Sequence, residues 1–152
     1  MPKLILMCGL PCSGKTTLAK QLEADLPALR ISPDDWITTL YGADVEKQVL
    51  DDMRYPVEAL GWKVAELALS LGQNVILDYG FWSREERDDY RTRGKVVGAK
   101  VEIQYLSVDL PSLQLRLEER NANLPEGTFD IAPEDLKKWF AMFEEPTEKE
   151  LL

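Results

Sequence analysis

The feature that most constrains this chain is a glycine-rich segment placed between two apolar patterns. Residues 9–16 read Gly-Leu-Pro-Cys-Ser-Gly-Lys-Thr and match G-x-x-x-x-G-K-[ST] at every defined position. The uninterrupted apolar run 4–8 precedes this segment and predicts a strand that is buried on both faces. Residues 15–26 follow it with apolar side chains at helical spacing. A strand, a glycine loop and a helix in this order are typical of a phosphate-binding loop, or P-loop.

The residue types of this loop explain how it can bind a nucleotide. Glycines allow backbone N–H groups to turn inward and form an anion-binding nest at a helix N-terminus. Lys15 supplies a cation to the β- and γ-phosphates, and the Thr16 hydroxyl is a candidate Mg²⁺ ligand. A strand-to-helix turn without a ligand is the structural alternative. We expect ATP and Mg²⁺ here, with eight residues holding the nucleotide: Gly9, Pro11, Cys12, Ser13, Gly14, Lys15, Thr16 and Thr17.

Length and composition are those of a single globular domain, which we predict over residues 1–152. The chain is 45% hydrophobic and 30% charged, so it can bury a core without a disulfide or metal. Its formal net charge of −9 disfavours nucleic acid and anionic membranes as partners. It has no histidine, which excludes a Ser-His-Asp triad, His-ligated zinc and an imidazole base.

The two cysteines and the N-terminus indicate the compartment. Cys8 and Cys12 cannot complete a zinc site without further Cys or His, and they suit a reducing environment. The N-terminal apolar run is far shorter than the ~20 residues of a membrane span. It leads into the glycine loop and not into a small-residue cleavage site. We therefore expect a cytoplasmic protein.

The rest of the chain alternates predicted strands and helices, which indicates a mostly parallel sheet in an α/β fold. Further strands are expected at 28–31, 75–78 and 101–108, and further helices after Ser32, over 44–71, after Ser83, over 111–121 and over 133–144. Pro56 predicts a break or kink in the long helix. The charge run 84–93 is interpreted as a solvated helix face, and the acidic tail 144–150 as a surface segment.

The order of these motifs resembles the small P-loop kinases grouped with polynucleotide 5′-hydroxyl kinases, zeta toxins and chloramphenicol phosphotransferase, with an AAA-type ATP-binding domain. The similarity covers about residues 3–146. It rests on the loop 9–17, on Ser-Pro-Asp at 32–34, on 75–78, and on 116–120 followed by 131–136. The resemblance implies a three-layer P-loop NTPase fold, with helices flanking a parallel sheet of four or five strands in the order 2-3-1-4. It also implies ATP-dependent phosphorylation of a hydroxyl group.

Asp34 is the candidate general base. It follows the second predicted strand, at the carboxyl edge of the sheet where ligands bind in such folds. A carboxylate there can accept the proton of a hydroxyl that attacks the γ-phosphate, and the resemblance implies the same role. The alternative is that Asp34 and Asp35 only favour the helix dipole behind a Ser32 cap.

Asp78 ends the third predicted strand and is a candidate Mg²⁺ ligand together with Thr16. The alternative is an aspartate that starts a turn before Gly80. Arg116 and Arg120, four residues apart, share one helix face.

The resemblance places these two arginines beside a mobile lid at about 116–133. It implies that they stabilise charge on the transferring phosphoryl group. Ordinary pairing with Glu118 or Glu119 is the alternative.

The acceptor is less well defined. In polynucleotide kinases an Arg that grips the acceptor's phosphate follows the catalytic Asp by three residues, and here that position is Ile37. With the negative net charge, this favours an uncharged or cationic small molecule. A polynucleotide or RNA 5′-hydroxyl kinase, and an ATP-hydrolysing switch that binds a protein partner, stay open. The aromatic residues after strands two and three are candidates for the acceptor pocket or the core: Trp36, Tyr79, Phe81 and Trp82.

The family commonly adds another strand after the last helix. In this chain the fifth strand is either absent or supplied by a partner. The oligomeric state is left open.

Overall fold

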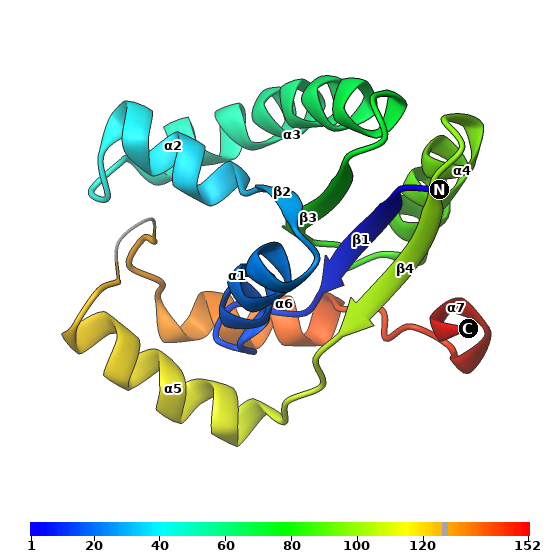
Figure 1. Cartoon of the computed structure of the whole chain (residues 1–152). Helices are drawn as coiled ribbons and strands as arrows, with labels where there is room; N and C mark the ends of the chain where they lie inside the picture. Colours follow the sequence, from blue (N-terminus) through cyan, green and yellow to red (C-terminus); the bar gives the residue numbers. More distant parts are fainter. Residues whose placement is uncertain (126–127) are drawn as a thin grey trace.

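Four parallel strands form the sheet of the computed structural model, which describes residues 1–125 and 128–152 (Figure 1). The strands are β1 (Lys3–Cys8), β2 (Ala28–Ile31), β3 (Asn74–Gly80) and β4 (Lys100–Tyr105). They lie in the order β2-β3-β1-β4, so the expected order 2-3-1-4 is confirmed. A fifth strand is not found in the described ranges. All three pairings are parallel, which brings the carboxyl ends of the strands to one edge.

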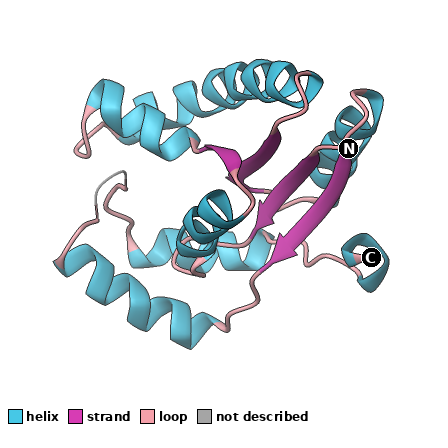
Figure 2. Ribbon diagram, in the orientation of Figure 1, coloured by secondary structure: helices cyan, strands magenta, loops and turns pink. Residues whose placement is uncertain are grey.

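Helices connect and follow the strands (Figure 2). They are α1 (Lys15–Asp25), α2 (Pro33–Tyr41), α3 (Lys47–Ser70), α4 (Arg84–Val96), α5 (Leu110–Ala122), α6 (Pro133–Met142) and α7 (Glu148–Leu151). The expected break at Pro56 is wrong, because α3 continues through it. Pro56 and Asp52, whose carbonyl loses its donor, are both exposed, so water can replace the missing bond. None of the helices in the described ranges is long and apolar enough to span a membrane.

The sheet is covered on both faces, as the three-layer expectation requires. Because side chains alternate along a strand, Leu4 and Leu6 of β1 face one way and pack with residues of α3 and α4, among them Trp62 and Tyr90. The other face is covered by α1: it carries Ile5, Met7 and Ile76, which pack against Ala19. The P-loop therefore begins at the end of a strand that is buried on both sides.

Two smaller clusters lie at the carboxyl edge of the sheet. α5 and α6 pack through Leu113, Leu117 and Leu136 together with Leu10 of the P-loop. The second cluster joins α2 and α3 through Ile37, Val57 and Phe129. In Figure 1, α2 with α3 and α5 with α6 lie on opposite sides of this edge.

The C-terminal segment is not simply a surface tail. Arg87 Nε lies 2.9 Å from Glu150 Oε1, and both side chains are 0% exposed. Arg87 Nη1 also donates to the carbonyl of Phe81 at 2.9 Å. The expectations of a solvated face over 84–93 and a surface tail over 144–150 are therefore wrong at these two positions. Each charge is buried because the other neutralises it, and the partners are 63 residues apart in sequence.

Candidate functional site

The loop after β1 has the backbone conformation of an anion-binding nest. Gly14, the N-cap of α1, has φ +93°, and Cys12 also lies in the left-handed region with φ +70°. Left-handed residues beside right-handed ones orient successive N–H groups into a concave anion site. Gly9 is needed for close packing, since a Cβ there would lie 2.7 Å from Ser13 Oγ.

Three hydrogen bonds fix this loop from neighbouring elements. The Gly9 N–H donates to the carbonyl of Gly80 at 2.9 Å, at the end of β3. The indole N–H of Trp82 donates to the carbonyl of Gly9 at 3.2 Å. Arg116 Nη1 donates to the carbonyl of Cys12 at 3.1 Å. The loop is therefore fixed to β3 on one side and to α5 on the other.

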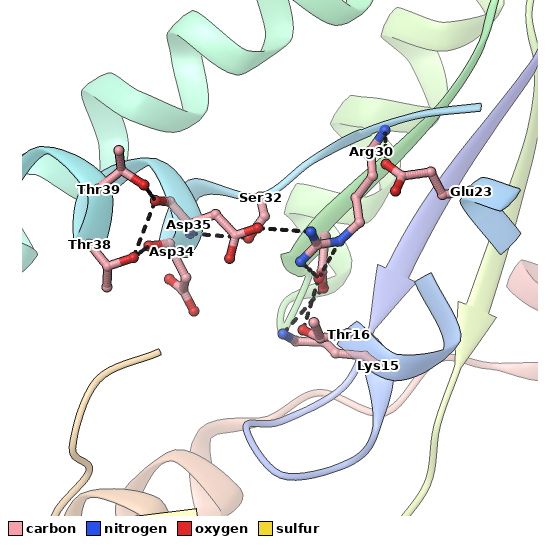
Figure 3. A network of polar contacts seen from close by, with 10 residues as sticks. Lys15, Thr16, Glu23, Arg30, Ser32, Asp34, Asp35, Thr38 and Thr39 are labelled. Atoms are coloured by element: carbon pink, nitrogen blue, oxygen red, sulfur yellow. Dashed lines mark hydrogen bonds and ion pairs between the residues drawn. The ribbon is translucent and has the colours of Figure 1, made fainter. Parts of the chain in front are cut away.

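Asp78, at the end of β3, is the centre of a charged network (Figure 3). Its side chain is 1% exposed, and Oδ1 lies 3.4 Å from Lys15 Nζ. Oδ2 accepts from the Thr16 hydroxyl at 2.9 Å and from Arg30 Nη2 at 3.0 Å. Burial alone would raise the pKa of Asp78, but Lys15 and Arg30 hold it below its ordinary value. The structure thus brings the two expected Mg²⁺ ligands, Thr16 and Asp78, into direct contact.

Arg30 was not identified from the sequence. Its side chain comes from β2 and is 7% exposed, and Nη1 donates to Asp35 Oδ2 at 2.8 Å while Nη2 bonds Asp78. Arg30 is the charged residue of a four-residue strand, Ala-Leu-Arg-Ile. A charge within a four-residue strand was the available signal, since a charged side chain that becomes buried requires a partner.

Asp34 and Asp35 are neighbours with different surroundings. Asp35 pairs with Arg30, and its backbone N–H donates to Oγ of the capping Ser32 at 3.3 Å. The Asp34 side chain points away from that contact (Figure 3), and its Oδ1 lies 3.2 Å from Arg54 Nη1 of α3. The Asp34 side chain is 37% exposed and lines the cavity described next, whereas Asp35 does not.

A cavity of about 1080 Å³ joins the P-loop to Asp34. It is lined by Pro11, Cys12, Gly14, Lys15, Thr16 and Thr17 from the loop and α1, and by Asp78. Gly9 and Ser13 lie outside this lining. Tyr79, Phe81 and Trp82 line the cavity as expected, whereas Trp36 packs with the core clusters instead.

The two arginines of α5 lie differently. Arg120 lines the cavity, and its Nη1 is buried without a hydrogen-bond partner in the part of the chain that the structure describes. Arg116 is exposed and bonds the P-loop carbonyl of Cys12. A lid at about 116–133 stays a prediction, and residues 126–127 of that range lie outside the described residues.

Two glutamates of the cavity lining were also missed. Glu58 follows Arg54 by one helical turn on α3, and Glu86 lies in the first turn of α4. Burial, reinforced by Glu86 and Asp34 and opposed by Arg54, raises the pKa of Glu58 to about 7. Burial also raises the pKa of Glu86. Nothing in the local sequence distinguished them from the solvated acids around them.

The two thiols differ in accessibility. Cys8 is fully buried, and burial raises its pKa to about 12. Cys12 is partly exposed in the cavity; burial raises its pKa as well, against the opposing effect of Arg120, Arg116 and Lys15. Both cysteines are free.

Comparison with known proteins agrees with this geometry. Residues 4–146 match the model of the AAA domain family, AAA_33. The chain belongs to this AAA domain family. No curated protein matches the sequence significantly.

Solved structures share the fold of this AAA domain. A candidate kinase from Chloroflexus aurantiacus has a TM-score of 0.76 at 20% identity, over 96% of this chain and 82% of its own. A chain of the Pnkp1/Rnl/Hen1 RNA repair complex has a TM-score of 0.75 at 19% identity, over 93% of this chain and 43% of its own. A gluconokinase from Sinorhizobium meliloti has a TM-score of 0.65 at 16% identity, over 99% of this chain and 79% of its own. The AAA domain therefore has a kinase-like P-loop fold.

Proposed function

We propose that this protein is an ATP-dependent phosphotransferase that moves the γ-phosphate to a hydroxyl of a small-molecule acceptor. One observation carries the proposal: a single cavity is lined both by the P-loop and by Asp34. A carboxylate beside a phosphate-binding loop is the arrangement that hydroxyl phosphorylation requires. The kinase-like fold and the gluconokinase among the structural neighbours support it. We propose that this activity belongs to a single domain over residues 1–152 and that the protein acts in the cytoplasm.

The residues of the loop fit the phosphates of ATP. The nest of Cys12 and Gly14 provides N–H donors, Lys15 provides a charge, and Nη1 of Arg120 is a buried donor without an acceptor among residues 1–125 and 128–152. Bound Mg²⁺–ATP would supply the transferable phosphoryl group. Thr16 and Asp78 are the residues that would hold the Mg²⁺, since both present oxygen ligands at one point.

Lys15 and Arg30 have separate tasks in this scheme. Lys15 is bound to Asp78 at 3.4 Å and turns to the phosphates when they are present. Arg30 keeps its contacts with Asp78 and Asp35, so the Asp78 carboxylate stays ionised and oriented. Arg120 stabilises charge on the transferring group from the cavity, and Arg116 fixes the loop through Cys12.

Asp34 is the general base of the proposal. Its contact with Arg54 orients the carboxylate, and its other oxygen has no hydrogen-bond partner among the described residues, which leaves it for the acceptor hydroxyl. The hydroxyl oxygen attacks the γ-phosphorus, its proton passes to Asp34, and the bond to the β-phosphate oxygen breaks to release ADP.

A 5′-hydroxyl RNA kinase is the second candidate, since a chain of an RNA repair complex shares the fold. Against it, Ile37 is fully buried with Val57 and Phe129 and does not line the cavity, so it cannot contact an acceptor phosphate. The net charge of −9 also opposes polynucleotide binding. A switch that binds a protein partner and hydrolyses ATP is the third candidate. For a switch, we expect the partner to stimulate ATP hydrolysis without any acceptor.

Labelled ATP, incubated with the protein and pools of metabolites and 5′-hydroxyl oligonucleotides, tests the proposal. We expect label in the metabolite fraction and acceptor-stimulated ADP release. Lys15→Ala is the control and should remove both transfer and the stabilisation by Mg²⁺–ATP, which is ~2.7 kcal/mol at 100 times the dissociation constant. Label in oligonucleotides would favour the RNA kinase. ADP release without transfer to any pool would favour the switch.

A further inference from the structure

Two groups of charged residues in the cavity lie near the P-loop and near Asp34; Lys20, Asp44, Lys47, Asp51, Asp130 and Asp135 also line the cavity. Near the P-loop, the positive charges of Lys15 and Arg30 act on Asp78, and Arg120 adds a third cation to the cavity lining. Where α2, α3 and α4 meet the cavity, the charges that act on Glu58 are Glu86, Arg54 and Asp34. We call the residues Asp34, Arg54, Glu58 and Glu86 the acceptor region. Three carboxylates face one guanidinium there, so the acceptor region is negative where the P-loop is positive.

The single guanidinium of the acceptor region is already engaged. Arg54 Nη1 lies 3.2 Å from Asp34 Oδ1. The Glu58 and Glu86 carboxylates have no hydrogen bond or ion pair with any described residue. The hydrogen bonds of these two residues with Tyr79 and Ser83 are made by their backbone carbonyl and N–H. Each lines the cavity and is half-buried. Two half-buried carboxylates without partners are unfavourable in their ionised form, so they either hold a proton or are stabilised by a cation that binds between them.

The position of Glu58 is fixed by its helix. The Tyr79 hydroxyl donates to the Glu58 backbone carbonyl at 2.9 Å, which joins this turn of α3 to β3. Glu58 also follows Arg54 by four residues, so both side chains lie on the helix face that lines the cavity. The carboxylate is therefore presented by two packed elements and not by a loop.

Aromatic rings form an adjoining wall of the cavity. Trp82 follows β3, and its ring lies 5.6 Å from that of Trp139 on α6. The face of an aromatic ring attracts ammonium and guanidinium groups, most strongly for tryptophan. Carboxylates beside aromatic rings in a partly desolvated cavity are the combination that recognises a cation, and an anionic acceptor would be repelled there.

We propose that the acceptor is an amino alcohol or amino sugar, whose cationic nitrogen is bound by Glu58 and Glu86 beside this aromatic wall. The inference rests on the proposed function and names its substrate class. The nitrogen fixes the acceptor so that one of its hydroxyls reaches Asp34. Glu58 and Glu86 thereby determine specificity, and they take no part in the bond changes at phosphorus.

Matched pairs of acceptors test this inference. Labelled ATP is offered with amino alcohols and amino sugars, with their N-acetylated counterparts, with neutral polyols, with sugar acids and with 5′-hydroxyl oligonucleotides. N-acetylation keeps the hydroxyls and removes the charge. We expect transfer to the amines and at least about 10-fold lower kcat/KM for the N-acetylated forms, the usual effect of losing a charged hydrogen bond.

Variants then connect the preference to the two glutamates. Glu58→Gln and Glu86→Gln should each raise KM for the amine by roughly 10–100-fold and so reduce its advantage over the N-acetylated form, with stabilisation by Mg²⁺–ATP unchanged. Glu66→Gln on α3 and Glu85→Gln on α4 are exposed controls outside the cavity lining and should behave like the parent. Melting of each variant checks that it folds, and the second variant decides if one does not.

The outcomes separate the inference from the proposed function. Transfer only to neutral, anionic or oligonucleotide acceptors would overturn the cationic acceptor and leave the phosphotransferase standing. An unchanged preference for the amine in both glutamine variants would overturn the roles of Glu58 and Glu86. Transfer to no acceptor, with Mg²⁺–ATP still bound, would overturn the proposed function and the inference with it.

Discussion

Arg30 Nη2 and Asp78 Oδ2 lie 3.0 Å apart and connect the ends of β2 and β3 inside the protein. The same guanidinium reaches Asp35 at 2.8 Å, so one buried cation orients two acids at the carboxyl edge of the sheet. Lys15 approaches Asp78 from the P-loop side. The geometry of this site is therefore set by a network in which each of these four charges has a partner of opposite sign.

Substitution of Arg30 tests that network. Arg30→Met should destabilise the fold by about 2–4 kcal/mol, because it leaves buried carboxylate charge uncompensated. It should also reduce the stabilisation by Mg²⁺–ATP, since Lys15 would be left as the single cation beside Asp78 in the described part of the chain. Arg30→Lys keeps a charge but not the fork and should be intermediate. Melting with and without Mg²⁺–ATP measures both effects; parent-like values in Arg30→Met would refute the role.

The Arg87–Glu150 pair predicts that the C-terminal segment contributes to stability. Glu150→Ala leaves Arg87 buried without its counter-charge and should cost about 3–5 kcal/mol in urea unfolding. Glu148→Ala, an exposed position on the same short helix α7, is the control and should change stability by less than about 0.5 kcal/mol. A cost below 1 kcal/mol for Glu150→Ala would mean that α7 releases Arg87 to water easily.

Glu58 predicts a pH dependence of stability with a definite sign. Its pKa is raised from an ordinary 4.5 to about 7, so between these values the folded state holds a proton that the unfolded state has released. Stability should therefore fall as pH rises from about 4.5 to 7. Glu58→Gln should flatten this slope and stabilise the protein at pH 8 by on the order of 1–3 kcal/mol.

Glu66→Gln on the same helix is the control for this measurement and should keep the parent slope. Glu86 has a raised pKa as well, and its charge helps to raise the pKa of Glu58. Glu86→Gln should therefore flatten the slope only in part, because burial and Asp34 still raise the pKa of Glu58 against the opposing effect of Arg54. Denaturant unfolding at a series of pH values decides. A parent and Glu58→Gln with the same slope would contradict the burial of this carboxyl.

Cys12 predicts selective and nucleotide-sensitive alkylation. It lines the cavity inside the P-loop, whereas Cys8 is fully buried with its thiol donating to the Phe81 carbonyl at 3.4 Å. Iodoacetamide should therefore label Cys12 first, and Mg²⁺–ATP should slow the reaction. Peptide mass spectrometry reads out the two sites. Equal labelling of both cysteines, unaffected by ATP, would show that the loop does not surround the phosphates.

The sequence predicted most of the fold because the signals for it are local. All four strands were located, β1 and β3 from apolar runs and β4 from alternating apolar and polar residues, and Ser32 and Ser83 cap α2 and α4. The strand expected over 101–108 ends at Tyr105. The Leu106 N–H still donates to the Cys8 carbonyl at 3.1 Å, and Val108 packs with the cluster of α5 and α6. The order of the strands was predicted from the family resemblance, because the apolar periodicity of a strand does not show which strands pair with it in the sheet.

What the sequence did not reveal depends on contacts across long separations. Arg30 meets Asp78 at a separation of 48 residues, and Arg87 meets Glu150 at 63, so neither pair has a local pattern. Glu58 differs from exposed acids only through the elements that bury it. Asp34 was chosen over Asp35 from its place after strand two and from the family resemblance, whereas the contacts of the two carboxylates with Arg54 and Arg30 were not predicted.

Phosphoryl transfer by Asp34→Asn is the most direct test of the central claim that Asp34 accepts the acceptor's proton. Asn keeps the size of the side chain but cannot accept a proton, so transfer from labelled ATP should fall by about 10²–10⁴-fold. Stabilisation by Mg²⁺–ATP should stay close to that of the parent. Asp35→Asn, which contacts Arg30 and not the cavity, should lose stability with transfer largely preserved. Near-normal transfer by Asp34→Asn would contradict the account.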